Sequence, residues 1–529
     1  MTGHLTMFST AVMLTLARDF GVRQVTGKAV NQPSTHNGKN VKPALPNGLN
    51  IPVVGSSGDD FEDTSIAFDP TNEQYGYAVT IFDASGGETF SNLIVGEACL
   101  VFQTVTGGTT WTFFGVLPLS FMSDTCTDPV VRWSPDGFYA YFAYLSVRHD
   151  GSTSDLDFVR TCYYGCGFTL QILFPGSAFS WFLDAPWVDV HQMDNAIVNV
   201  QGRPSQANWV YVTFTYFEPG SGWNVIGELS NDNFGSSDSW SLNGPLTPYP
   251  TPSTQLVQLA RPMGGMYNTA FSTADLLVCW YYSGTDGILA GMFDIQCSHS
   301  PDHGADWFPI VNVANNVKYE LPFWLCPDDN YEAWWTGMAP SIAITPDGVA
   351  HIAFTASNFD PNMPHVHKTD CGDIKYVRSK PFLYDASSSW LPVKTAAGGS
   401  LAQGFPTLVA QLRPALPPTS LGYRLYLFYY DAKNSPTSCT SSPPPTGTKC
   451  YANLMYDIYM RTSNNGGSSF SSDTRITDQS SMVQVDFVGD YFDSTATSRK
   501  AWVIWVDRAD QLFYGNVGSS VLTQPVSSQ

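Results

Sequence analysis

The sequence predicts an all-β fold, a β-propeller, from three observations: a composition typical of short strands and turns, a strand pattern that recurs, and a turn motif that recurs. Charged residues make up 13% of the 529 residues and aromatic residues 14%, and the chain holds 44 Gly and 36 Pro. This mixture suits many short strands joined by turns, whereas long helices need more Lys, Glu and Ala. With 43% hydrophobic residues the chain can build a large core, which argues against disorder.

The recurring pattern is a pair of strands that occurs seven times. The first strand often opens with Pro and ends at a Pro or an Asp-Gly turn, and the second is rich in aromatic residues. The first strands lie at residues 64–70, 129–137, 186–190, 256–262, 340–348, 406–414 and 488–492, and the second strands begin near residues 75, 138, 209, 276, 349, 423 and 501. The copy at 340–348 is the clearest and the copy at 256–262 the weakest.

The spacing of the copies, roughly 60 to 85 residues, fits a four-stranded blade with loop insertions. We therefore predict seven four-stranded blades in one domain over residues 51–529, with six blades as the alternative if the copy at 256–262 is not a blade. A row of separate β-sandwiches would also contain short strands, but it would not explain one recurring pattern.

The recurring turn is a Ser/Thr-x-Asp-x-Gly-x-x-Trp/Phe hairpin. In it a short acid accepts backbone N–H bonds, Gly takes a positive φ, and the aromatic residue packs between sheets. The full match is Ser300, Asp302, Gly304 and Trp307, and a match with Asn for Asp is Ser463, Asn465, Gly467 and Phe470. Two degraded copies are Thr104, Gly108 and Trp111, which lack the acid, and Ser230, Asp232, Gly235 and Trp240, which carry extra residues.

This hairpin is the Asp box, and through it the chain resembles the sialidase superfamily over about residues 55–529. The stretches 184–187 (Asp-Ala-Pro-Trp) and 489–491 (Gly-Asp-Tyr) also look like members of that superfamily. Because the box lies on the blade periphery in those families, the resemblance implies the fold and no catalytic residue.

A sialidase holds the substrate carboxylate with three arginines and uses a Tyr–Glu nucleophile pair and an Asp acid/base. The first arginine belongs to a Phe/Tyr-Arg-Ile-Pro motif, and the nearest sequence here is Leu-Asn-Ile-Pro, with Asn50 at the arginine position. Asn lacks the charged fork that binds a carboxylate in two places. The remaining candidates are Arg132, Arg261, Arg461, Arg508, Asp59, Asp60, Asp63 and Tyr491. Each also has a structural interpretation, as a strand ion pair or a solvated acidic loop.

No motif requires a cofactor. The acidic loops could bind a structural Ca²⁺ through their carboxylate oxygens. His365 and His367, with Asp370 nearby, have a spacing that puts both rings on one strand face, where they could ligate a metal. A solvated loop is the favoured interpretation, and we assign no metal site here.

The formal net charge is −21, from 46 acidic against 25 basic residues. Such a surface repels a phosphate backbone or an anionic membrane, so nucleic acid is excluded as a partner. The apolar run at residues 7–17 has the length of a signal-peptide core and is too short to span a bilayer. Glycans remain candidate ligands.

The ten cysteines show no CxxC pair and no metal-ligand spacing, which favours disulfides and an extracellular location. Local pairing is expected for Cys439 with Cys450, for Cys279 with Cys297, and for Cys162 with Cys166. The partners of Cys99, Cys126, Cys326 and Cys371 are left open.

Residues 1–50 combine the apolar segment with a polar stretch, residues 24–50, that has no apolar periodicity and predicts an extended arm. Such a terminus is disordered unless something ties it down. We expect it to dock on a neighbouring copy, which would make the protein a non-enzymatic subunit of an extracellular polymer. The alternatives are an arm that folds back to complete the last blade and, for function, an exo-acting glycoside hydrolase of sialidase type.

Overall fold

The computed structural model describes most of the chain from residue 51 onward. The described residues are 51–55, 60–83, 89–90, 93–94, 97–120, 123–148, 151–162, 167–192, 208–218, 224–232, 240–247, 256–268, 273–283, 292–318, 339–356, 372–399, 403–412, 422–434, 455–482, 491–507 and 520–527. The arm of residues 1–50, including Asn50, lies outside them.

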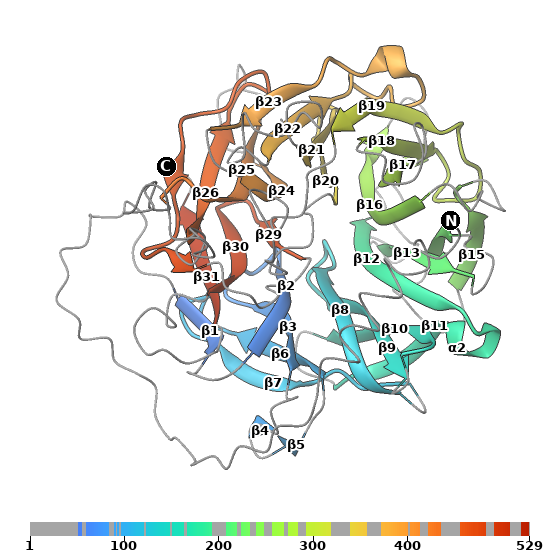
Figure 1. Cartoon of the computed structure of the whole chain (residues 1–529), viewed down its shortest axis with the longest axis vertical. Helices are drawn as coiled ribbons and strands as arrows, with labels where there is room; N and C mark the ends of the chain where they lie inside the picture. Colours follow the sequence, from blue (N-terminus) through green and yellow to red (C-terminus); the bar gives the residue numbers. More distant parts are fainter. Residues whose placement is uncertain are drawn as a thin grey trace, which may run out of the picture.

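Seven antiparallel sheets stand around one axis, six with four strands and one with five (Figure 1). The innermost strands of neighbouring sheets contact one another all the way round. These strands are β2 (Asp60–Phe68), β8 (Ser123–Trp133), β12 (Phe182–Gln192), β16 (Leu256–Asn268), β20 (Ser341–Ile344), β24 (Gln403–Leu412) and β29 (Asp493–Ala496). The predicted β-propeller is confirmed, and we number its blades 1 to 7 in this order.

Each blade continues outward through three further strands. The second strands are β3 (Gly76–Asp83), β9 (Tyr139–Arg148), β13 (Asn208–Phe217), β17 (Thr273–Ser283), β21 (Ala350–Ala356), β25 (Tyr423–Asp431) and β30 (Lys500–Asp507). The third strands are β6 (Ala98–Thr104), β10 (Ser154–Cys162), β14 (Asn224–Asn231), β18 (Met292–Ser300), β22 (Asp373–Arg378), β26 (Met455–Ser463) and β31 (Ser520–Ser527). The outermost strands are β7 (Thr112–Val116), β11 (Thr169–Phe174), β15 (Trp240–Pro245), β19 (Val311–Lys318), β23 (Lys394–Ala397), β27 (Thr474–Arg475) and β1 (Ile51–Gly55).

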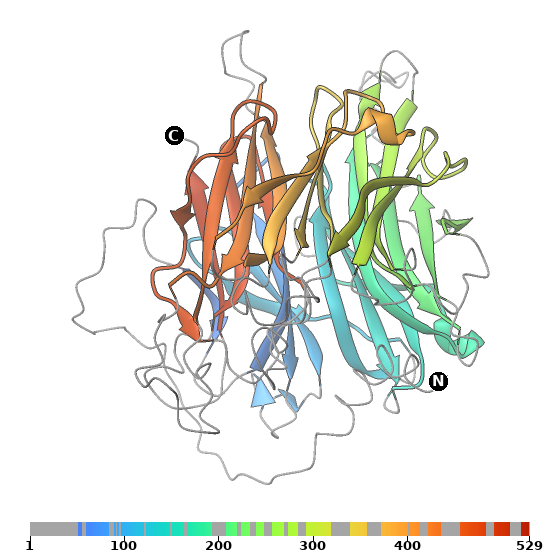
Figure 2. The ribbon, with the colours of Figure 1, turned by 45° about the horizontal axis from the view of Figure 1, so that its top comes forward.

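Four small elements complete the described structure. They are the two-stranded hairpin β4 (Thr89–Phe90) and β5 (Leu93–Ile94), the short helix α2 (Gly176–Phe179), the 3-10 turn η1 (Ser387–Ser389), and β28 (Ser481–Met482), which pairs with β26 and makes blade 6 five-stranded. The tilted view in Figure 2 shows the blades side by side around the axis.

Blade 7 is built from both ends of the described chain. β1 pairs antiparallel with β31, with Ile51 opposite Thr523 and Gly55 opposite Ser520. This pairing covers the outer edge of the last sheet, which would otherwise present unpaired backbone groups. Residues 51–55, directly after the arm, therefore complete the last blade. The alternative in which the arm itself folds back to do so concerns residues 1–50, which lie outside the described residues.

A bulge bends five of the seven inner strands at equivalent points. The bulge residues with positive φ are Asp63, Asp128, Ala185, Leu259 and Phe405, and the strand register shifts at each of them. Pro follows the bulge in blades 2, 3 and 6. The bulge leaves an unpaired residue in the ladder, so a residue without a backbone N–H is tolerated there. This explains why Pro opens the recurring pattern in the sequence.

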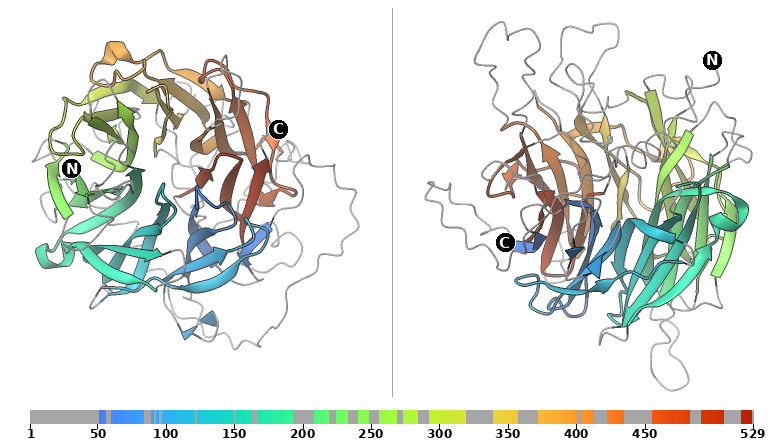
Figure 3. Two further views of the ribbon diagram at one scale, coloured as in Figure 1. Left: turned by 180° about the vertical axis from the view of Figure 1, so that it is seen from behind. Right: turned by 60° about the horizontal axis from the view of Figure 1, so that its bottom comes forward.

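The core lies between the blades, where aromatic side chains from adjacent sheets interlock. At the junction of blades 7 and 1 the rings of Trp502 and Phe68 stack at 3.9 Å. At the junction of blades 1 and 2 Tyr77 stacks on Trp133 at 5.2 Å. The views from behind and from below show the same radial packing of sheets (Figure 3). No helix in the part of the chain described here is long and apolar enough to cross a membrane.

The Asp boxes connect the third and fourth strands of their blades and so lie on the rim. In blade 4 the Ser300 hydroxyl donates to Asp302 Oδ1 at 2.9 Å and accepts from the Gly304 N–H at 2.7 Å. In blade 6 Ser463 makes the same two contacts with Asn465 and Gly467, at 2.8 and 2.9 Å. Trp307 and Phe470 are each partly buried against the core.

The degraded box of blade 1 keeps this geometry without an acid. The Gly108 N–H donates to Thr104 Oγ1 at 3.0 Å, and Thr106 Oγ1 accepts from the Thr110 N–H at 3.0 Å. Thr106 thus takes the position of Asp302, whose Oδ1 accepts from the Asp306 N–H at 2.8 Å. One acceptor oxygen at this position is enough to close the turn.

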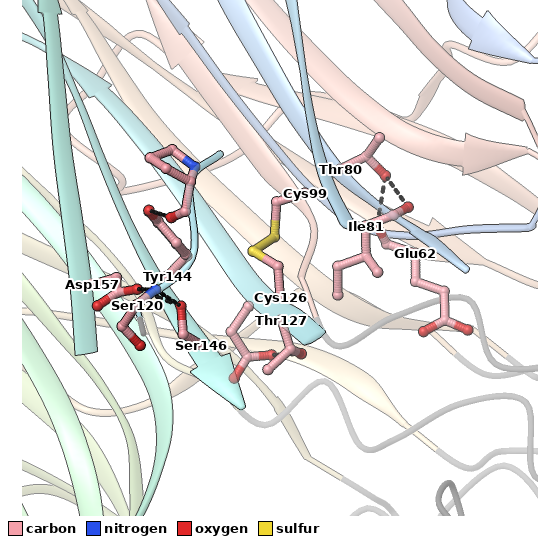
Figure 4. The surroundings of a disulfide bond; sticks show 12 residues. Glu62, Thr80, Ile81, Cys99, Ser120, Cys126, Thr127, Tyr144, Ser146 and Asp157 are labelled. Carbon is pink, nitrogen blue, oxygen red and sulfur yellow. Dashed lines mark hydrogen bonds between the residues drawn. A yellow bond between two sulfur atoms is a disulfide. The ribbon is translucent and has the colours of Figure 1, made fainter. Parts of the chain in front are cut away.

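Two disulfides join strands of the described structure. Cys279 and Cys297 face each other across β17 and β18, with an S–S distance of 2.01 Å. Cys99 and Cys126, whose partners the sequence leaves open, bond at 1.99 Å and tie blade 1 to blade 2 (Figure 4). Cys162 is also disulfide-bonded, whereas Cys166, Cys439, Cys450, Cys326 and Cys371 lie outside the described residues.

A buried carboxyl reinforces the same junction. Asp157 Oδ2 accepts from the Ser120 N–H at 2.9 Å and from the Ser146 hydroxyl (Figure 4). Burial raises the pKa of Asp157 to about 7, and its bonds to the two serines oppose that rise. The connection from blade 1 to blade 2 is therefore held both covalently and by a desolvated carboxyl.

Candidate functional site at the centre of the ring

Four inner strands bring two arginines, a tryptophan and an aspartate together. Arg132 on β8 donates to both carboxylate oxygens of Asp493 on β29, at 2.7 and 3.2 Å. Its guanidinium carbon lies 4.9 Å from the ring centroid of Trp187 on β12, and that of Arg261 on β16 lies 3.5 Å from the same centroid. Trp187 thus receives a cation–π contact from each neighbouring blade.

The placement of Asp493 follows from a bonding pattern that three of the inner strands share. Ser65 Oγ accepts from the Val131 N–H of the next blade at 3.1 Å, and Ser341 Oγ accepts from the Leu408 N–H of the next blade at 2.8 Å. Asp493 does the same for blade 1, because its Oδ2 accepts from the Ile66 N–H at 3.3 Å and from the Ser65 hydroxyl at 2.7 Å. A carboxylate thus replaces a hydroxyl, and Arg132 balances its charge.

Asp189 on β12 lies beside this pair. Its Oδ2 accepts from the Gly264 N–H of the next blade at 2.7 Å. The side chain keeps a partly exposed edge, yet protein surrounds it closely enough that loss of water raises its pKa to about 6, against the opposing effects of the Gly264 N–H and the Arg132 charge. A carboxyl with this pKa can hold or release a proton near neutral pH.

A second carboxyl lies earlier on the same strand. Asp184 accepts a hydrogen bond from the Gln258 amide of β16. Burial raises the pKa of Asp184, and the bond from Gln258 opposes the rise. Both side chains are partly exposed. Together they offer an acceptor and a donor, the pair of functions that binds hydroxyl groups.

Arg261 is 7% exposed and remains a cation at neutral pH. Burial lowers its pKa to about 10, the charges of Asp493 and Tyr491 oppose the fall, and Arg132 adds to it. Tyr491 is buried too, with its ring edge-on to Trp187 at 5.6 Å and its N–H donated to Asp63 Oδ1 at 3.0 Å. Tyr491 and Asp63 therefore support the cluster from the side of blades 7 and 1.

The inner strands divide the ring into a polar sector and a neutral one. On blades 1 to 4 the partly exposed residues include charged or hydrogen-bonding side chains, namely Glu62, Thr127, Arg132, Asp184, Asp189, His191 and Gln258. On blades 5 to 7 the partly exposed residues of the described inner strands are Ile344, Val409, Ala410, Thr495 and Ala496. The chemistry of the ring is therefore concentrated on blades 1 to 4, together with Asp493.

The structure separates the candidates that the sequence put forward. Arg132 and Arg261 meet at Trp187, whereas Arg461 lies on the rim, where it pairs with Asp473 and donates to the Ala396 carbonyl at 2.6 Å. The site thus contains two arginines within the described residues and not the three of a sialidase clamp. Asp59, Arg508, His365, His367 and Asp370 lie outside the described residues, and only the strand position of Asp60 is described.

Sequence reasoning missed Asp189 and Asp493 and singled out Trp187 only through resemblance. A signal was present, because Asp493 lies where other copies of the pattern carry the hydroxyls of Ser65 and Ser341. An acid at a position where two other copies carry Ser indicates a special role. No group of three or more His, Cys, Asp or Glu side chains with metal-binding geometry occurs in the described part of the chain.

No family model matches the sequence, and no curated protein matches it. Solved structures are similar only at the level of architecture. An α-L-arabinofuranosidase of Fusarium graminearum shares 9% identity over 91% of this chain and 98% of its own, with a TM-score of 0.40. A Hadza microbial sialidase shares 10% over 92% and 98%, with a TM-score of 0.40. A levansucrase of B. megaterium shares 9% over 68% and 92%, with a TM-score of 0.37. Likeness at this level says nothing about substrate or chemistry.

Proposed function

We propose that this propeller is a glycoside hydrolase whose reaction takes place in the polar sector of the ring. The observation that carries the proposal is that one guanidinium, that of Arg132, interacts with two carboxyls in different surroundings. Asp493 is locked in a two-pronged ion pair, whereas desolvation raises the pKa of Asp189 to about 6. A carboxylate beside a carboxyl that can hold a proton near neutral pH is the usual pair for glycosidic bond cleavage.

Each residue of the site has its own role in cleaving the glycosidic bond. Asp189 donates a proton to the oxygen of the leaving group, so that this oxygen departs as a hydroxyl. The carboxylate of Asp493 supplies negative charge toward the positive charge that develops on the sugar ring, and Arg132 fixes its orientation. Asp184 and Gln258 bind sugar hydroxyls. Water completes the cleavage by adding to the sugar carbon and gives its proton to the Asp189 carboxylate, which restores the acid.

A non-enzymatic structural or binding role, the main expectation from the sequence, is the second candidate. The observation in its favour is that Trp187 and Arg261 are 4% and 7% exposed and satisfy each other. A ring whose charges are already paired also serves simply to hold the blades together. Extracellular assembly through the arm belongs to this second candidate.

One assay decides between the two candidates. Purified protein is tested on fluorogenic 4-methylumbelliferyl glycosides that cover neutral pyranosides, neutral furanosides and a sialoside. We expect release from at least one neutral glycoside and a loss of about 100-fold or more in kcat for Asp189→Asn. Asp385→Asn, which changes an exposed carboxyl outside the ring, should keep full activity. Failure to cleave any member, or equal activity of both variants, rejects the hydrolase.

A further inference from the structure

A surface of one exposed and three partly exposed aromatic rings lies where blade 2 passes to blade 3, outside the ring of charges. The ring of Trp181 lies nearly parallel to those of Phe174 and Tyr216, with centroids 5.8 and 5.1 Å away and interplanar angles of 12° and 14°. Phe174 and Tyr216 are 6.1 Å apart at 22°. Phe179 adds a fourth ring, 5.2 Å from Trp181, and is 56% exposed.

The spacing of these rings shows that they form a layer and not a column. Three parallel rings stacked face to face would place the outer two at least about 7 Å apart, twice the contact distance between carbon atoms. Here all three centroids lie within 6.1 Å of one another. At least one pair must therefore lie side by side, which widens the apolar face beyond one ring. Phe174, Trp181 and Tyr216 are all partly exposed.

The turn that carries Phe179 and Trp181 is held rigidly to blade 2. The Ser177 N–H donates to Asp155 Oδ1 at 2.9 Å, and the Trp181 N–H donates to the Gly176 carbonyl at 2.9 Å. Gly176 is required, because a Cβ there would come within 2.3 Å of the Ser154 carbonyl oxygen. A preformed surface loses little conformational entropy on binding.

We propose that this aromatic surface, defined by Phe174, Phe179, Trp181 and Tyr216, binds the chain of a neutral polysaccharide. The apolar C–H faces of sugar rings stack on aromatic rings, and a group of adjacent, accessible aromatic rings on a soluble protein indicates a binding site. Residues 167–183 contain no Asp, Glu, Lys or Arg, and the chain carries a net charge of −21. Both facts favour an uncharged ligand over an acidic polysaccharide or an anionic membrane.

The surface lies at the start of the strand that carries part of the candidate site. Trp181 directly precedes β12, and Asp184 follows three residues later, at about 10 Å along an extended strand. A chain bound on the aromatic surface would thus lead toward Asp184 and Gln258. This step rests on the proposed hydrolase, which would then act on a polymer; binding itself does not depend on it.

Native gel electrophoresis in gels cast with hydroxyethyl cellulose, arabinoxylan or laminarin tests the proposal. Polygalacturonate serves as the charged polymer. We expect at least one neutral polymer to retard the full chain, and Trp181→Ala and Phe179→Ala to weaken that retardation at least fivefold. Phe138→Ala is the matched control, because Phe138 is 63% exposed on the β8–β9 turn of a different face. Thermal unfolding of each variant reports whether it folds, and Phe179→Ala removes a mostly exposed ring.

The outcomes separate the two proposals. The aromatic surface is supported as a polysaccharide-binding site if a neutral polymer still retards Asp189→Asn but no longer retards Trp181→Ala. This outcome does not depend on whether the protein cleaves any glycoside. The polysaccharide proposal is rejected if no neutral polymer retards the protein, or if Phe138→Ala is as weak as Trp181→Ala. Trp181-dependent binding to phosphatidylcholine vesicles, or a dimer that Trp181→Ala disrupts in light scattering, would overturn it in favour of a lipid surface or a second copy.

Discussion

Arg132 and Asp493, 361 residues apart in the chain, form a two-pronged ion pair at 2.7 and 3.2 Å across the junction of blades 1, 2 and 7. Their side chains are 19% and 2% exposed. Asp493 also accepts from the Ser65 hydroxyl, so one carboxylate ties three inner strands together. The pair is therefore structural as well as part of the candidate site.

Removing one partner of this pair should strongly destabilise the protein. Arg132→Met leaves a buried carboxylate unpaired, and we expect a loss of about 3 to 5 kcal/mol in the free energy of unfolding by urea. The double variant Arg132→Met/Asp493→Asn should recover part of the loss. Arg461→Met, which breaks the more exposed pair with Asp473, should cost about 1 kcal/mol or less. Equal losses for both arginines would contradict this assignment.

Glu228 should make the protein less stable as pH rises. It is fully buried on β14, Oε2 accepts from the Asn243 amide at 2.8 Å, and burial raises its pKa from 4.5 to about 8. Between these values the folded state binds more protons than the unfolded state, so stability falls with increasing pH and levels off above about 8.

Glu228→Gln removes that dependence. At pH 9 we expect a gain on the order of 4 kcal/mol over the parent in urea unfolding, and at pH 4 little difference. Asp385→Asn, at an exposed carboxyl, should follow the parent at both pH values. A variant that gains nothing at pH 9 would show that the carboxyl is not desolvated as described.

The disulfide between Cys99 and Cys126 should stabilise the first blade junction. It closes a sequence separation of 27 residues, for which restriction of the unfolded chain predicts about 2 to 4 kcal/mol. The double variant Cys99→Ala/Cys126→Ala should lose that amount in urea, and reduction of the variant should cost less than reduction of the parent. No difference between the two proteins would mean that the non-covalent contacts around Asp157 suffice.

Two truncations distinguish a docking arm from a closing strand. Deleting residues 1–50 leaves β1 in place, so the fold should keep its thermal stability, and any assembly that the arm mediates should disappear in light scattering and electron microscopy. Deleting residues 1–55 also removes the pairing of β1 with β31 and should lower the melting temperature. If the full chain is already monomeric, or if assembly survives the deletion of residues 1–50, the arm does not build an extracellular polymer.

A fluorogenic sialoside should not be turned over. The sequence places Asn50 at the position of the first clamp arginine, and the fork of Arg132 is already occupied by Asp493. A substrate carboxylate would have to displace that internal carboxylate. Measurable hydrolysis that Tyr491→Phe abolishes would overturn this expectation and restore a sialidase mechanism.

The sequence by itself determined the elements that depend only on residues close together in the chain. Six of the seven copies of the strand pattern overlap the first strand of a blade, and all seven second strands of the pattern overlap the second strand of a blade. Hydrophobic alternation and a short turn specify such a hairpin without distant help. The copy at 488–492 runs just ahead of β29, which begins at Asp493. The Asp boxes and the pair Cys279 and Cys297 are local in the same sense, since each lies within one hairpin of blade 4 or blade 6.

Only the tertiary structure decided which distant residues meet. Cys99 and Cys126 lie on different blades, so their pairing depends on how the sheets pack. Arg132, Trp187, Arg261 and Asp493 come from four inner strands that become neighbours only when the ring closes. A strand pattern specifies the direction of a side chain within its own sheet, but the angle between sheets is set by the packing of all seven. The raised pKa values of Asp189 and Glu228 have the same origin, because desolvation depends on what the neighbouring blade places over the carboxyl.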